Sequence, residues 1–188
     1  MNRKRKLHQR IVFGVLAFIL SAGLLASSLS FIPGLNGTQA ENALPQEQKL
    51  PTSEELLEKS NASPNDAGVL KELAQAYTRE GQTDKAVETY EKAASLAPDR
   101  EDIKTALGGS YVSAGKYDQA IGVLDGIISK NPNSKDAYYY YGHALVGKKE
   151  YEKAIEKFER FVQLAGEKDP ETARVKSIIE TLKPLVKK

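Results

Sequence analysis

The stretch that decides the fold is residues 67–100, "AGVLKELAQAYTREGQTDKAVETYEKAASLAPDR". It contains two apolar stripes at the helical spacing i, i+3, i+4 and i+7, separated by the turn "EGQTD" at 80–84. Each stripe predicts an amphipathic helix, so the stretch predicts a helix-turn-helix pair. One such pair cannot bury both of its apolar faces alone, and it therefore needs similar neighbours to form a core.

The same pattern returns twice, in residues 101–134 and 135–168, at an interval of 34 residues. In these two repeats the turn after the first helix reads "AGKYD" and "GKKEY". The glycines Gly81, Gly115 and Gly147 are predicted to end the first helix of each pair. Six columns share the register, namely Pro64/Pro98/Pro132, Ala86/Ala120/Ala154, Tyr90/Leu124/Phe158, Ala74/Gly108/Gly142, Leu73/Leu107/Tyr141 and Tyr77/Tyr111/Leu145. The small residues of one column are predicted to let paired helices approach closely.

These columns resemble the tetratricopeptide repeat (TPR) family. Residues 67–100 match every expected position, whereas the second repeat departs from the pattern at Lys104 and Ile127 and the third at Phe161 and Gly166. The resemblance implies an all-α fold, a TPR α-solenoid with three helix-turn-helix repeats at 67–100, 101–134 and 135–168.

Residues on both sides of the repeats predict further helices. Residues 52–66 read as a partial repeat helix that begins with a capping box from Thr52 to Glu55. Residues 169–188 predict a C-terminal cap helix, with apolar residues on one face and charged residues on the other. The apolar face consists of Val175, Ile178, Ile179 and Leu182.

The head of the chain predicts membrane attachment. Residues 1–10 are basic, residues 11–32 contain no charge, and residues 33–51 read as a linker. A helix of 22 residues at about 1.5 Å per residue spans a bilayer core of about 30 Å. The basic flank predicts a single-pass signal anchor in a bacterial inner membrane, with the N-terminus cytoplasmic and the repeats outside the cytoplasm. The alternative is export after signal cleavage near Ala40.

Charge and composition argue against several functions. Five of the 27 Lys and Arg residues and none of the 25 acids lie in residues 1–40, so the remainder holds 22 basic and 25 acidic residues. A domain of net charge −3 is not expected to bind nucleic acid. The chain has no cysteine, and His143 has no second histidine outside the basic tail. We therefore expect no catalytic residues, no metal, no cofactor and no enzymatic activity.

The resemblance implies that an extended peptide or a helix binds in a concave groove lined by the first helix of each repeat. In this sequence the lining positions are Lys71, Gln75, Thr78, Arg79, Thr105, Gly109, Val112, Tyr139, Tyr140, His143 and Val146. The family's chaperone-binding branch uses a clamp of Lys, Asn and Arg for two carboxylates. Only Lys71 matches that clamp, because Gln75, Ala106 and Tyr139 depart from it.

Four consecutive tyrosines, Tyr138 to Tyr141, are divided by this register. Tyr138 and Tyr141 are predicted to pack in the core, whereas Tyr139 and Tyr140 are predicted to face the groove with His143. The leading hypothesis is a membrane-anchored scaffold or adaptor that binds a protein or peptide partner. The alternatives are an assembly helper for a membrane complex, such as one for cytochrome c maturation, and a structural protein that self-associates weakly.

Overall fold

The computed structural model describes residues 50–186, so the predicted basic tail, membrane segment and most of the linker lie outside the described residues. Residues 50–186 form eight helices and no strand. The helices are α2 (Ser53–Ala62), α3 (Ala67–Arg79), α4 (Thr83–Leu96), α5 (Glu101–Ser113), α6 (Tyr117–Lys130), α7 (Lys135–Gly147), α8 (Tyr151–Ala165) and α9 (Pro170–Val186). None of these eight combines the length and the apolar content that a bilayer crossing requires.

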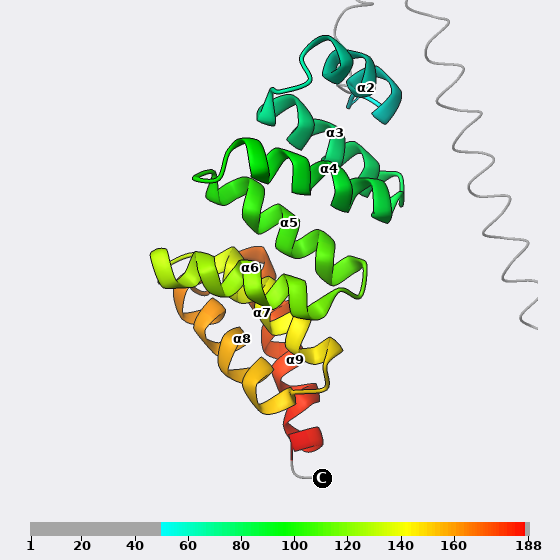
Figure 1. Ribbon diagram of the computed structural model, residues 1–188. Helices are drawn as coiled ribbons and strands as arrows, with labels where there is room; N and C mark the ends of the chain where they lie inside the picture. The colour runs from blue at the N-terminus through cyan, green and yellow to red at the C-terminus, as the bar shows by residue number, and fades with distance from the viewer. Residues whose placement is uncertain (1–49, 187–188) are drawn as a thin grey trace, which may run out of the picture. The chain divides into compact units, whose positions relative to one another are not determined.

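The helices stack in chain order from α2 to α9, each against the next (Figure 1). Helices α3, α5 and α7 are the first helices of the three repeats, and α4, α6 and α8 are the second helices. Helix α7 also packs directly against α5, so the first helices of the second and third repeats are neighbours in the stack. The predicted all-α solenoid is confirmed for the described residues.

Small residues bring the two helices of a repeat close together, as the sequence predicted. A Cβ atom on Gly108 would lie 2.6 Å from the Leu124 side chain, and a Cβ atom on Gly142 would lie 2.5 Å from the Phe158 ring. Leu124 and Phe158 are fully buried at this contact. The glycine on the first helix therefore makes room for a large apolar side chain on the second.

The turn between the helices of a repeat has one geometry in all three units. The amide of the residue after the turn donates to a carbonyl five residues earlier, from Gln82 to Tyr77, from Lys116 to Tyr111 and from Glu150 to Leu145, at 2.8–2.9 Å. These bonds follow a left-handed residue, which is glycine in the first two repeats, at 81 and 115.

Gly147 is the last residue of α7, as predicted, but it is not the left-handed residue of the third turn. The left-handed residue there is Lys149, with φ 63°, which is in register with the two glycines. A Cβ atom on Gly147 would lie 2.2 Å from the Tyr117 ring. Its lack of a side chain serves packing between repeats.

The features predicted for the two ends of the stack are present. The predicted capping box is present, because the Thr52 hydroxyl accepts from the Glu55 amide and the Glu55 carboxylate accepts from the Thr52 amide. At the other end, α9 buries Val175, Ile179 and Leu182 against α8, whereas Ile178 is only half-buried. Helix α9 therefore covers apolar surface that the third repeat would otherwise expose.

Candidate protein-binding surface

The eleven predicted lining positions lie on α3, α5 and α7, the three first helices. They do not form one uniform surface. On α3 three are exposed and Lys71 is half-buried, on α5 three are buried or half-buried, and on α7 four are half-buried. The three helices therefore present different chemistry along the stack.

The α3 end is polar, and its lysine is occupied by an interaction within the chain. The Lys71 ammonium lies 2.6 Å from the Asp102 carboxylate on α5, and Arg100 donates two hydrogen bonds of 2.7 Å to the same carboxylate. These bonds, first from Arg100 and then from Lys71, hold the pKa of Asp102 well below its usual range. Lys71 therefore joins two repeats as well as lying at the predicted surface.

Two further predicted positions on α3 are also engaged. Arg79 donates to the Pro51 carbonyl, and the Thr78 hydroxyl donates to the Ala74 carbonyl of its own helix. Gln75 is exposed on the same face. The polar end of the surface thus consists of groups that largely serve the fold.

The α5 segment is small, as the sequence indicated, but it is not an open depression. Thr105 and Gly109 are buried, and Val112 is half-buried. A Cβ atom on Gly109 would lie 2.8 Å from the Tyr140 ring, so this ring covers the glycine and joins α7 to α5. Tyr140 acts mainly in packing, and burial raises the pKa of its phenol.

The α7 end is aromatic. The Tyr139 and His143 rings meet edge to face with centroids 4.6 Å apart, and Tyr139 lies 5.4 Å from Phe161 of α8. The Nε2 atom of His143 is buried and has no hydrogen-bond partner among the described residues. Burial, with a smaller contribution from the nearby Arg174 charge, lowers the pKa of His143.

The expected division of the four tyrosines holds only in part. Tyr138 and Tyr141 pack against the core but are half-buried, and they are therefore not the core anchors that the sequence predicted. The cations of Arg160 and Lys157 lie over these two rings, at 5.9 Å and 5.4 Å from the centroids. Long charged side chains on α8 cover rings that the helical pattern alone assigned to the interior.

Helix α9 adds two residues that sequence reasoning missed. After burial, the charge of Arg174 lowers and the charge of Glu171 raises the pKa of both His143 and Tyr139. Arg174 and Glu171 form an ion pair with each other at 3.5 Å. Continuing the 34-residue register by one more unit would have placed Arg174 in the column of Tyr140. The apolar face of α9 predicts its packing on α8, whereas Arg174 lies on its exposed face.

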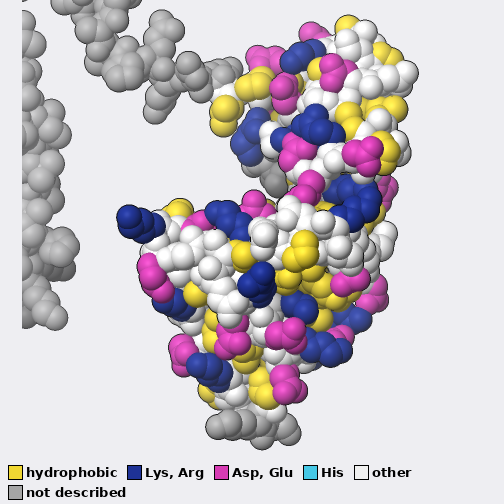
Figure 2. All heavy atoms as spheres, turned by 90° about the vertical axis from the view of Figure 1, so that its left-hand side faces the viewer, with side chains coloured by type: hydrophobic (Ala, Val, Ile, Leu, Met, Phe, Trp, Pro, Cys, Tyr) yellow, Lys and Arg dark blue, Asp and Glu magenta, His cyan; other side chains and the backbone are white. Residues whose placement is uncertain are grey.

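The residues described show no cluster of three or more side chains suited to holding a metal ion. The face in Figure 2 carries Lys and Arg side chains interspersed with Asp and Glu, without a single-sign patch. This distribution is that of an ordinary solvated surface rather than a phosphate-binding one.

These observations define the class of protein: a helical-repeat array with a short surface along its first helices. The family model described as tetratricopeptide repeat matches residues 105–170, and the model described as anaphase-promoting complex, cyclosome, subunit 3 matches residues 46–127. Residues 105–170 therefore match the tetratricopeptide repeat that the sequence pattern predicted.

Solved structures with this architecture include MamA from AMB-1, which is 27% identical with a TM-score of 0.61, over 71% of this chain and 77% of that chain. MamA residues 41 to the end from Desulfovibrio magneticus RS-1 are 24% identical with a TM-score of 0.58, over 72% and 80%. The first TPR of Spaghetti (RPAP3) bound to the HSP90 peptide SRMEEVD is 22% identical with a TM-score of 0.58, over 65% and 94%. No curated protein matches the chain.

Proposed function

We propose that this chain is a non-enzymatic scaffold that binds a segment of a partner protein against its first helices. The observation that carries the proposal is the aromatic end of that surface. There, half-buried Tyr139 and His143 lie beside Arg174, and a buried histidine nitrogen lacks a hydrogen-bond partner among the described residues. Aromatic and arginine side chains are those that contribute most to protein interfaces.

The chemistry at this end favours a partner segment that combines an apolar side chain with a hydrogen-bond donor or acceptor. An apolar side chain placed against Tyr139 would bury the part of the ring that is still exposed and would itself lose contact with water. A polar group of the partner could reach the buried Nε2 atom of His143 only through a shift of the side chains around it, and it would then supply the hydrogen bond that this atom lacks. The solved complex of the RPAP3 repeat with an HSP90 peptide illustrates peptide binding by a TPR fold, while this chain lacks the residues of the chaperone clamp.

The proposal includes the membrane anchor. Residues 11–32 would anchor the protein as a single span, and the repeats would lie outside the cytoplasm. A reporter fused to the C-terminus tests this part by itself. An active extracytoplasmic reporter is expected, and a cytoplasmic signal would refute the orientation without bearing on the binding surface.

The binding surface is tested by placing a photo-crosslinking residue at position 139 of the full-length chain in its native membrane. Adducts of discrete mass with a second protein are expected there. They should be absent at position 88, an exposed site on α4 that serves as the matched control. An adduct with a second copy of this chain would instead support self-association. Equal adducts at both positions would refute a specific surface.

A charge variant gives a second test. Arg174 is exposed, so Arg174→Glu is expected to leave the melting temperature nearly unchanged while it weakens partner binding about tenfold. The matched control is Ala173→Ser, a neutral change at the exposed residue next to it, which should bind normally. Unchanged partner binding by the Arg174→Glu variant would show that Arg174 of α9 is not part of the binding surface.

A further inference from the structure

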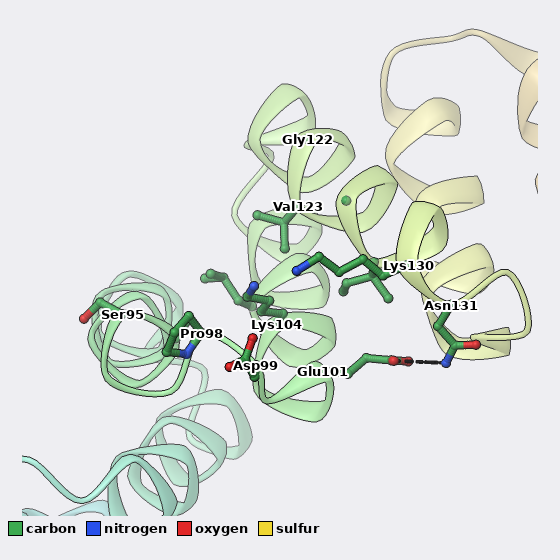
Figure 3. Close-up of a pocket in the computed structure, with 13 residues that line it drawn as sticks. Ser95, Pro98, Asp99, Glu101, Lys104, Gly122, Val123, Lys130 and Asn131 are labelled. Atoms are coloured by element: carbon green, nitrogen blue, oxygen red, sulfur yellow. Dashed lines mark hydrogen bonds between the residues drawn. The ribbon is translucent and has the colours of Figure 1, made fainter.

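A pocket of about 610 Å³ lies on the second repeat, between α4, α5 and α6 (Figure 3). It is separate from the eleven predicted lining positions, since none of them contributes to its wall. Its apolar wall includes Leu107, Val123 and Ile127, and its volume is in the range of ligand-binding pockets.

The third repeat shows why the pocket exists. There, the Arg160 guanidinium lies 5.9 Å from the centroid of the Tyr138 ring and reaches the carbonyl of Pro132 at 3.4 Å. The two side chains thus bridge α7, α8 and the loop before α7. The 34-residue register places Lys104 where the third repeat has Tyr138, and Gly126 where it has Arg160.

Replacement of an arginine by glycine and of a tyrosine by lysine leaves this space open in the second repeat. Gly122 and Gly126 are both exposed, and a Cβ atom on either would meet no atom within 4 Å. Neither glycine therefore fills the space between α6 and Pro98, which is the counterpart of Pro132 in the 34-residue register. In the third repeat, the side chains of Tyr138 and Arg160 lie at the equivalent place.

The charges around the pocket favour an anionic group. The amines of Lys104 and Lys130 point into it (Figure 3), and neither has a carboxylate within 4.0 Å among residues 50–186. Two acids also line the pocket. The Glu101 carboxylate accepts two hydrogen bonds, of 3.0 Å and 3.1 Å, from the Asn131 side-chain amide. Asp99 is exposed at the edge of the pocket.

We propose that this pocket binds a segment of a partner protein that carries a large apolar side chain next to a carboxylate. The apolar side chain would fill the space that Tyr138 and Arg160 fill in the third repeat. The carboxylate would pair with Lys104 and Lys130, which have aliphatic stems that extend the apolar wall. The site would give the protein a second interaction surface, independent of the one along its first helices.

The test uses the full-length protein and a short capped peptide, acetyl-Ala-Phe-Asp-Ala-amide, with a fluorine label on the phenylalanine. Broadening of the fluorine NMR signal during titration measures binding. Changing the aspartate of the peptide to asparagine, or its phenylalanine to a labelled alanine, is expected to weaken binding about tenfold, because both parts contribute to recognition. Equal binding of all three peptides would overturn the proposal. Binding of decanoate by a protein that binds none of the peptides would also overturn it, in favour of a lipid ligand.

Two variants locate the binding on the protein. Lys104→Tyr combined with Gly126→Arg copies the third repeat and closes the pocket, so peptide binding should be lost without a lower melting temperature. Lys130→Glu preserves the shape and reverses one charge, so it should weaken binding about tenfold even if the double variant fails to fold. Gln75→Ala, on the first-helix surface, is the control and should bind normally. Normal binding by Lys130→Glu would overturn the assignment.

Discussion

The second and third repeats follow the same backbone path and differ in what fills it. In each, a glycine on the first helix receives a large side chain from the second helix, Leu124 in one and Phe158 in the other. Around this shared contact the third repeat has four tyrosines and His143, whereas the second has Lys104, Thr105, Ala106, Leu107 and Gly109 at the equivalent positions.

The difference shows that one repeat register permits two kinds of surface. Rings in the third repeat fill the space on both sides of α7, and they reach α5 through Tyr140 and α8 through Tyr139. Small and charged residues in the second repeat leave a pocket beside α6. The repeated columns set the distance between helices, and the residues between those columns decide where a partner finds room.

The largest expected effect tests the shared contact. Phe158→Ala should lower the free energy of unfolding by about 3–5 kcal/mol and Leu124→Ala by about 2–5 kcal/mol, because each leaves a cavity in a closed core. Urea unfolding followed by circular dichroism measures both. A loss below about 1 kcal/mol at Phe158, near the scale of ordinary surface changes, would mean that the third repeat is not organised around this ring.

The next effect separates buried from open glycines. Gly142→Ala places a methyl group against the Phe158 ring and should destabilise the protein by about 1–3 kcal/mol. Gly126→Ala is the matched control, since its methyl group meets open space, and it should stabilise α6 by about 0.5–1 kcal/mol. Melting temperatures that shift in the same direction for both variants would contradict the contrast between the repeats.

The turns offer a third comparison. Lys149→Gly should stabilise the third repeat by about 1 kcal/mol, because it removes a side chain from a left-handed residue. Gly115→Ala at the same place in the second repeat should destabilise by a similar amount, about 1 kcal/mol. Chemical denaturation of the two variants checks this prediction. A loss of stability in Lys149→Gly would show that the lysine side chain contributes more than its backbone conformation costs.

The smallest expected effect is the pH dependence of stability that His143 causes. It concerns only the third repeat, because the second repeat has Gly109 at the equivalent position. The pKa of His143 is lowered in the folded state, so the unfolded chain binds this proton first as the pH falls. Stability should therefore decrease from about pH 7 downward and level off below the folded pKa, with a slope under about 1.4 kcal/mol per pH unit.

His143→Gln supplies the control for this pH effect, because it removes the titrating group and leaves His8 in both proteins. Melting temperatures measured between about pH 8 and pH 5, on either side of an ordinary histidine pKa, should fall more steeply for the unchanged protein than for the variant. Parallel curves for the two proteins would show that His143 titrates equally in the folded and unfolded states.

Much of the fold could be predicted because its causes are local and periodic. Apolar spacing indicated the helices, the 34-residue interval indicated their stacking, and Thr52 with Glu55 indicated a cap that is present. The site was harder to predict. Helical angles assign a face to each residue, but they give no information about side chains that arrive from neighbouring helices, such as Arg160 over Tyr138 or Tyr140 over Gly109.

The sequence by itself determined that the chain forms paired amphipathic helices in a repeating array, because helical periodicity and small-residue columns are properties of the chain. Only the tertiary structure decided which of those residues remain accessible. Lys149 rather than Gly147 makes the third turn, Lys71 is engaged by Asp102, and Lys104 and Lys130 are directed into a pocket. Accessibility depends on the volume and charge of residues from neighbouring repeats, which meet only when the helices stack.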